Sequence, residues 1–286
     1  MGKANKVKGE LIEVKDLVEL IQVLKDVADL KYLALLSNRS QFLRFGESFT
    51  EFFRLLSSTQ VAHPLVTNKN PKLGVVVITT EQGFVGDLNS KVVERALQER
   101  EKNPEIAYIT VGRKGVAKIE SMGVKNLKTF EDVEETGLYE TAVSVKNFVV
   151  DLVMKNGLGR VMIIYPWAKD FTTIKARVVR LLPCDDLLPQ KTQSIEEFSR
   201  VIEESDPVDM IGYLANLWLA SRIYEILFDT TLAAAAAQAQ QLDSSLGKMK
   251  KENAVVKLKY RKAKKSDIDN SLREVFSARM MTQKAG

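Results

Sequence analysis

The sequence predicts an α/β protein in which one α/β domain with a mainly parallel sheet lies between two long terminal helices. Two observations predict the helices: no proline occurs in residues 5–58 or 208–279, and apolar residues recur in both segments at helical spacing. A third observation predicts the domain, because short β-branched runs alternate with amphipathic stretches between those two segments.

The first long helix is expected over about residues 5–58. Its apolar residues are mostly three and four positions apart, which places on one face Leu17, Ile21, Leu24, Ala28, Leu35, Phe42, Phe45, Phe49, Phe52 and Leu56. A helix of this length is about 80 Å long at 1.5 Å per residue. Because this exceeds the diameter of a small domain, the helix must pair with another long helix or project into a partner.

The middle of the chain reads as an α/β sandwich. The expected strands are the apolar runs Leu73–Thr80, Ile106–Val111, Arg160–Tyr165 and Thr172–Leu182. The expected helices are Asn89–Gln98, a short helix from the Gly112–Gly115 turn to Met122, and Leu138–Lys155. Strands that alternate with helices predict a Rossmann-like domain with a mainly parallel sheet.

The second long helix is expected to start at Asp206 as its cap, with Pro207 in the first position. A heptad-like seam follows at Leu242, Leu246, Met249, Val256, Tyr260 and Ala263, with Asn253 in one polar place, and resumes out of phase at Ile268, Leu272 and Val275. If both helices leave the same side of the domain, they form a long antiparallel coiled coil. The run Ala233–Ala237 fits either close backbone approach or high helix propensity.

These patterns divide the chain into an N-terminal coiled-coil helix (residues 1–60), a central α/β domain (61–205) and a C-terminal coiled-coil helix (206–286). Net charge is +5 and the pI is about 9.0, which permits an anionic partner without choosing one. The one cysteine, Cys184, and the one histidine, His63, cannot supply a four-ligand zinc site. No segment has the ~20 apolar residues that span a bilayer, so any membrane association is expected to come through partners.

Two glycine-containing turns follow strands and are the most site-like segments of the domain. Glu81–Ser90 places G-x-x-G before a helix, where phosphate can bind, but it lacks the endings of a P-loop and of a dinucleotide site, which favours a structural turn. Gly112–Gly115 carries Arg113 and Lys114, which fit either contact with an acidic surface or a solvated turn.

The clearest charge feature is the segment Lys248–Lys265, with nine positive charges and one negative charge, Glu252. Clustered Lys and Arg on a helix fit a shaft inside an acidic protein collar, a solvated coiled-coil surface, or a nucleic-acid-binding helix. No aromatic ladder accompanies the charges, which disfavours nucleic acid. Neighbouring carboxylates such as Glu134 and Glu135 point in different directions and form no acid/base pair, so no catalytic residues are expected.

Four stretches, in order along the chain, resemble the γ subunit family of F-type ATP synthases. His63-Pro64-Leu65 resembles the exit from the first helix of that family, and Val76–Ser90 resembles its strand followed by a G-L-C-G-G-x-N turn. Ile109–Gly115 (ITVGRKG) matches its second strand and G-R-K-G turn, and Leu258–Ala278 resembles its C-terminal run. The family's K-A-M-x-M-V-A-A-x-K segment reads Val23–Lys31 here, and its usual A-R-Q triplet reads Ala263-Lys264-Lys265.

The resemblance implies a rotor shaft without an active site. In that family, three α and three β subunits surround the coiled coil, and its lower end binds the ε subunit and the c ring in the membrane. Ion flow turns ring and shaft, and the asymmetric shaft drives each β subunit through its states. The expected location is the cytoplasmic face of the bacterial plasma membrane, as a peripheral subunit. Neither a cofactor, a directly bound nucleotide nor a nucleic acid is expected.

The resemblance also implies where this chain touches partners. Lys25, Lys264 and Lys265 would meet acidic or polar loops of β, and Arg261 in the same basic segment is expected to bind partners too. Leu24, which stands where the family has its first Met, would pack between the two helices. Arg113 and Lys114 would face ε and the c ring.

Two other classes compete with this interpretation. A coiled-coil protein that binds nucleic acid through Lys248–Lys265 would show a salt-sensitive affinity for DNA or RNA. A small α/β enzyme with helical oligomerisation arms would bind a nucleotide at Gly83–Ser90.

Overall fold

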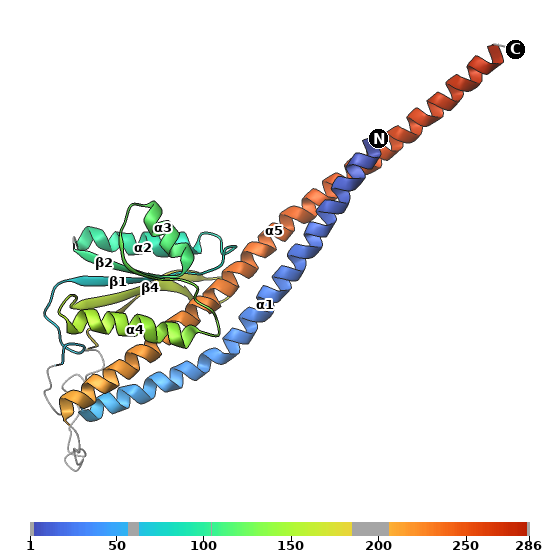
Figure 1. Ribbon diagram of the computed structural model, residues 1–286. Helices are drawn as coiled ribbons and strands as arrows, with labels where there is room; N and C mark the ends of the chain where they lie inside the picture. Colours follow the sequence, from blue (N-terminus) through green and yellow to red (C-terminus); the bar gives the residue numbers. More distant parts are fainter. Residues whose placement is uncertain (1–2, 57–62, 104, 185–205, 285–286) are drawn as a thin grey trace. The chain divides into compact units, whose positions relative to one another are not determined.

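The computed structural model describes residues 3–56, 63–103, 105–184 and 206–284. The chain forms two compact units, one made of Met1–Ala28 with Ala239–Gly286 and the other of Asp29–Gln238. Helices α1 (Lys3–Leu56) and α5 (Pro207–Lys284) run through both units (Figure 1). The domain boundaries predicted from the sequence, at 60/61 and 205/206, lie near the ends of the two long helices, whereas the two compact units divide within these helices. The predicted boundaries stay a prediction.

In the first unit, α1 and α5 form an antiparallel pair, as predicted. The backbone N–H of Ala4 donates to the carboxylate of Asp267 at 3.0 Å, while Lys25 Nζ lies 3.8 Å from Asp243 Oδ1. The residue numbers of the contacts therefore decrease along α5 as they increase along α1, which makes the two helices antiparallel. The N-terminus lies beside the C-terminal half of α5 (Figure 1). A carboxylate beside the first amides of α1 also interacts favourably with the helix dipole.

The α1 seam lies one residue away from the predicted one at two positions. Leu17 and Leu24 are 45% and 46% exposed, whereas Val18 and Lys25 are half-buried. The less exposed positions follow an alternating three- and four-residue spacing at Ala4, Val7, Leu11, Val14, Val18, Ile21, Lys25 and Ala28. This spacing is that of a coiled-coil heptad. In the structure of the single chain, Leu24 is exposed and does not pack between the two helices, so that prediction is wrong.

The α5 seam is the predicted one up to Ala263. Leu242, Leu246, Val256 and Ala263 are buried. Met249, Asn253 and Tyr260 are half-buried between them. The next position in the same spacing is Asp267, whose carboxylate accepts a hydrogen bond from the backbone N–H of Ala4. Beyond it, Ile268, Leu272 and Val275 are exposed by 51%, 53% and 65%, so the seam that was expected to resume there has no partner helix in the described part of the chain.

The second unit contains a five-stranded sheet of order β3-β2-β1-β4-β5. Its strands are β1 (Leu73–Ile78), β2 (Ile106–Val111), β3 (Asn126–Phe130), β4 (Arg160–Ala168) and β5 (Ile174–Leu182). The first four are parallel, and β5 pairs antiparallel with β4. The mainly parallel sheet is confirmed, and all six residues of β1 are buried, as a central strand requires.

The edges of the sheet differ most from the sequence-based expectation. Strand β3 has the sequence NLKTF, whose polar content gave no strand signal. Strand β5 begins at Ile174 rather than Thr172, because the Asp170 carboxylate accepts from the backbone N–H groups of Thr172 and Thr173 in a turn.

Helices cover both faces of this sheet (Figure 1). The helices α2 (Leu88–Lys102) and α3 (Arg113–Ser121) pack on one face. The helix α4 (Leu138–Met154) and the first part of α5 pack on the other. Asp206 caps α5 as predicted, since its carboxylate accepts from Val208 N at 2.8 Å. No helix in the described residues is long and apolar enough to cross a membrane.

Candidate functional site

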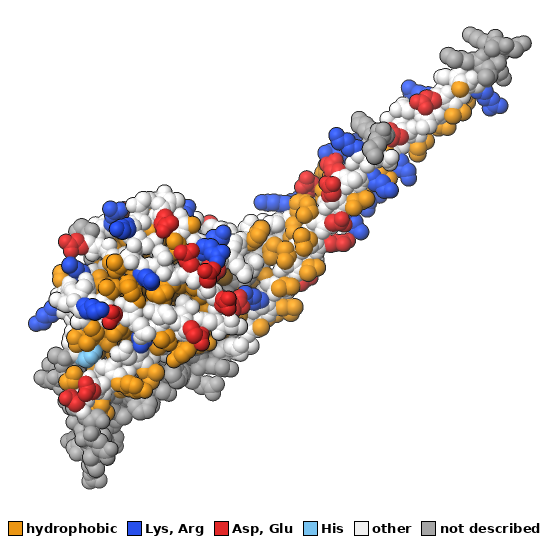
Figure 2. Space-filling view, viewed as in Figure 1, with side chains coloured by type: hydrophobic (Ala, Val, Ile, Leu, Met, Phe, Trp, Pro, Cys, Tyr) orange, Lys and Arg blue, Asp and Glu red, His pale blue; other side chains and the backbone are white. Residues whose placement is uncertain are grey.

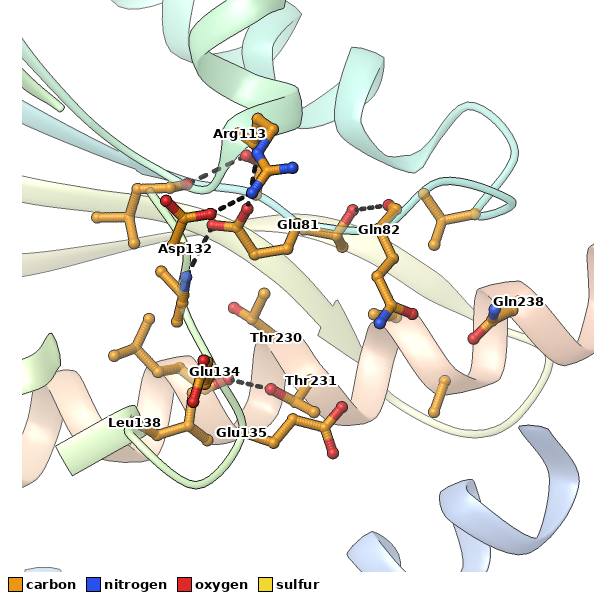
Figure 3. A pocket seen from close by; sticks show the side chains of 18 of the residues that line it. Glu81, Gln82, Arg113, Asp132, Glu134, Glu135, Leu138, Thr230, Thr231 and Gln238 are labelled. Carbon is orange, nitrogen blue, oxygen red and sulfur yellow. Dashed lines mark hydrogen bonds and ion pairs between the residues drawn. The ribbon is translucent and has the colours of Figure 1, made fainter. Parts of the chain in front are cut away.

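A cleft of about 540 Å³ opens at the carboxyl ends of β1, β2 and β3, where α/β proteins of this topology bind ligands (Figure 3). Its strand-end wall includes Thr80, Glu81 and Asp132, and α5 supplies the opposite wall with Thr230, Thr231 and Gln238. The carboxylates outnumber the cations in the lining, which disfavours a phosphate ligand.

The mouth of this cleft is braced by Arg113. Its guanidinium pairs with Asp132, and its Nε lies 3.7 Å from Glu81 Oε2 (Figure 3). The other oxygen of Glu81 accepts from Val133 N at 3.1 Å. One side chain therefore ties together the segments that follow β1, β2 and β3. Arg113 was predicted to meet a partner, and the structure gives it a partner within the domain.

The Gly112–Gly115 turn is poorly suited to phosphate. Two amides in the first turn of α3 already have acceptors: Gly115 N donates to Thr79 Oγ1 at 2.8 Å, and Lys114 N donates to the Thr80 carbonyl at 3.3 Å. A Cβ on Gly112 would lie 2.4 Å from the Thr79 carbonyl oxygen, so close approach of β1 dictates glycine there. Lys114 itself is exposed.

The Glu81–Ser90 turn is held in a similar way. Thr80 N donates to the Asn89 side chain at 3.1 Å, and Asn89 Nδ2 donates back to Thr80 Oγ1 at 2.8 Å. Val85 and Leu88 are buried against Ala237 of α5. These contacts favour the structural interpretation of the turn over a nucleotide site.

The alanine run of α5 packs against two different neighbours, which supports its close-approach interpretation. Ala235 and Ala236 are buried in a cluster with Tyr32 of α1. Ala237 is buried against the Glu81–Ser90 turn. Larger side chains would hold these elements apart.

His63 and Cys184 have structural surroundings. Leu65 N donates to His63 Nδ1 at 3.2 Å, and burial lowers the pKa of the ring. Cys184 is buried, with Sγ 3.0 Å from the Leu65 carbonyl oxygen. In the described part of the chain, no three His, Cys, Asp or Glu residues are grouped so that they would hold a metal ion.

The other predicted contact residues lie at two levels of the helix pair. Lys25 lies opposite Asp243, whereas the exposed residues Arg261, Lys264 and Lys265 lie near the level of Ala4. Asp243 and Lys264 are separated by about 30 Å of helix at 1.5 Å per residue. The structure therefore does not bring Lys25 together with the basic C-terminal residues. In the view of Figure 2, Lys and Arg side chains lie along both edges of the helix pair.

The sequence interpretation missed two paired acids, Asp267 and Asp229. Asp267 occupies the next seam position after Ala263, and its carboxylate accepts from Ala4 N in the first turn of α1, where a negative charge is favourable. Its place in the seam was the available signal. Asp229 is 6% exposed and pairs with Arg39 of α1 at 3.3 Å, and burial raises its pKa while Arg39 lowers it. No local signal distinguishes Asp229 from the many exposed acids of the chain.

Comparison with known proteins gives one consistent family. The model of a family described as ATP synthase matches residues 3–279. A relative described as ATP synthase gamma chain, from Pasteurella multocida, is 21% identical over 284 residues, covering 97% of this chain and 98% of the relative. Another gamma chain, from Lachnoclostridium phytofermentans, is 23% identical over 229 residues, covering 78% of this chain and 79% of its own length.

Solved structures share the fold. A chain of the Euglena gracilis mitochondrial ATP synthase, in an OSCP/F1/c-ring structure, superposes with a TM-score of 0.68 at 18% identity, covering 99% of this chain and 95% of that chain. A chain from the central stalk and c-ring of the Tetrahymena thermophila mitochondrial enzyme gives 0.60 at 18% identity, covering 79% of this chain and 99% of that one. With the family match over residues 3–279, these findings show that the chain belongs to the ATP synthase family.

Proposed function

We propose that this chain is the γ subunit of an F-type ATP synthase, a rotor shaft that performs no chemistry itself. The observation that carries the proposal is the family match over residues 3–279, on a chain whose two terminal helices form an antiparallel pair. The gamma-chain relatives and the central-stalk structures support it. The partners are the α and β subunits, the ε subunit and the c ring, at the cytoplasmic face of a bacterial plasma membrane.

A shaft acts by biasing conformational equilibria. The α/β ring has several states, and a rotor that contacts them differently favours one state at each angle. This requires a surface that differs around the axis. The helix pair has such a surface near Gln22, whose Oε1 lies 3.5 Å from Lys250 Nζ, because exposed Leu20 and Val23 lie there on α1 while exposed Lys248 and Lys250 lie on α5.

Exposure supports the proposed contact roles. Lys264 and Lys265 are exposed, as contacts with acidic or polar loops of the β subunits require, and the exposed Arg261 would extend the same basic surface. Leu24, with 46% of its surface exposed, is available to a ring subunit rather than to α5. Lys114 is exposed on the turn that would face ε and the c ring, where Arg113 acts mainly as a brace.

Purification of the tagged chain from membranes in mild detergent tests the proposal. We expect a large assembly that contains α and β subunits and hydrolyses ATP. A chain that purifies alone, or with DNA or RNA bound in a salt-sensitive manner, would contradict the proposal and favour the nucleic-acid interpretation of Lys248–Lys265.

A further inference from the structure

The second unit holds α5 and α1 in different ways. The first part of α5 lies in the main hydrophobic core, with Ile211, Leu219 and Ile223 buried against the sheet. Among its described side chains, α1 contacts this unit farther along α5, through an apolar cluster of Tyr32 with Ala235 and Ala236 and through charged side chains. Lys31 pairs with Glu135 in the segment after β3, and Tyr32 stacks edge-on against Phe171 with ring centroids 5.1 Å apart.

Arg39 makes the most connected of these α1 contacts. Its Nε lies 3.3 Å from Asp229 Oδ1 on α5. One of its terminal nitrogens donates to the Ala168 carbonyl at the end of β4, at 3.1 Å. The guanidinium also lies over the Trp167 ring, 5.7 Å from its centroid, and Arg177 of β5 lies over the same ring at 4.9 Å. A single side chain thus joins α1 to α5 and to the sheet.

These contacts add a directional restraint to the apolar packing around Tyr32. Interdigitated apolar side chains also resist sliding, but the hydrophobic effect that holds them together is itself non-directional. Hydrogen bonds and paired charges weaken steeply when their geometry changes. The Asp229 side chain is only 9% exposed, so losing its partner leaves a buried charge unpaired.

We propose that Arg39, through Asp229, Ala168 and Trp167, is the positioning residue that locks α1 to α5 and the sheet within this unit, so that these elements carry torque as one body. The proposal rests on the proposed rotor function. It identifies where load on α1 passes into the α/β domain, and it assigns Asp229 a role in coupling rather than in partner contact.

The test uses the complete complex with wild-type, Arg39→Ala, Arg39→Lys or Arg39→Ala/Asp229→Asn chains. Two quantities are measured: ATP hydrolysis in detergent, where the rotor turns without load, and the largest ion gradient that ATP hydrolysis sustains in proteoliposomes. We expect R39A to keep the hydrolysis rate and to lose part of the gradient. R39K should lie between, since an ammonium group does not reproduce the fork and stacking contacts of a guanidinium.

The double variant separates torque transmission from stability. Replacing Asp229 by Asn removes the buried unpaired charge, so thermal unfolding of the isolated chain should recover toward the wild-type midpoint, while the sustained gradient stays low. In the isolated chain, amide hydrogen exchange of α1 around Arg39 should also be faster in this variant than in the wild type.

Arg95→Ala supplies the matched control. Arg95 and Glu99 form a 2.6 Å ion pair with 32% and 8% side-chain exposure, close to the 27% and 9% of Arg39 and Asp229, but both lie on α2. R95A should lower thermal stability without lowering the gradient. If the Arg39→Ala/Asp229→Asn chain recovers its stability and sustains a full gradient, the proposed role of Arg39 is wrong while the rotor function stands. A wild-type chain that forms no coupled complex would overturn the rotor function and the lock together.

Discussion

At the scale of single residues, the Thr79 side chain at the end of β1 determines whether the start of α3 can bind a phosphate. Its hydroxyl accepts from Gly115 N at 2.8 Å and lies 3.1 Å from the Val111 carbonyl oxygen, to which it donates. It therefore occupies the place where an α/β fold presents helix amides to a phosphate. The glycines at 112 and 115 are explained by this packing rather than by a ligand.

Gly112→Ala should be strongly destabilising. Gly112 has φ +96° and its added Cβ would meet the backbone of β1, so we expect a loss of about 3 kcal/mol or more in the free energy of unfolding, measured by urea denaturation. Gly123→Ala is the control, because Gly123 also has positive φ (+71°) but nothing within 4 Å of its added Cβ. We expect about 1–2 kcal/mol for that conformational strain alone. Equal losses would show that the close approach costs nothing.

His63 should make stability depend on pH. Because burial lowers its folded pKa below 6.5, the unfolded chain binds the proton first. The His63 contribution is fully present above pH 6.5 and is lost as pH falls from there to the folded pKa, with a slope up to about 1.4 kcal/mol per pH unit. His63→Asn keeps an acceptor for Leu65 N and removes the titration. Urea unfolding across this range should therefore give a flatter profile for H63N, and an identical slope would contradict the assignment.

At the scale of elements, the existence of every long helix and central strand could be predicted from periodicity, but the α1 seam could not. The helix carries two apolar stripes, and Leu17 and Leu24 belong to the exposed one. Sequence alone does not say which stripe meets α5, since the larger side chains lie on the side that faces away from it. Strand β3 was missed for a related reason: an edge strand needs little apolar sequence.

The two stripes of α1 should differ in their energetic roles. Val14 is 8% exposed, so Val14→Ala should cost about 1.5–2 kcal/mol at about 0.8 kcal/mol per buried CH₂. Leu24→Ala should cost less than about 0.5 kcal/mol, because Leu24 is 46% exposed and alanine is the better helix former. Urea unfolding of the isolated chain, followed by circular dichroism, measures both. A larger loss for L24A would restore the seam that the sequence suggested.

At the scale of the whole molecule, the family could be identified from the sequence, whereas the contact residues could be placed only in part. Four short motifs in the right order were enough for the family, because their order and spacing add specificity that no single motif has. Arg113 shows why contacts are harder. Its exposed position in a basic turn suggested a partner surface, but its pairing with Glu81 and Asp132 depends on strand ends that are distant in sequence.

The basic residues Lys264 and Lys265 of α5 give the sharpest prediction at this scale. Lys264→Glu with Lys265→Glu should lower the ion transport obtained per ATP hydrolysed in vesicles, since reversal turns attraction to acidic β loops into repulsion, on the order of 1 kcal/mol per exposed pair. Lys69→Glu with Lys72→Glu makes the same change in net charge at exposed positions before β1 and should leave coupling unchanged. Equal losses in both variants would mean that overall charge, and not this end of the helix, governs coupling. No loss in K264E/K265E would remove these two lysines from the mechanism and leave shape as the source of the rotor's asymmetry.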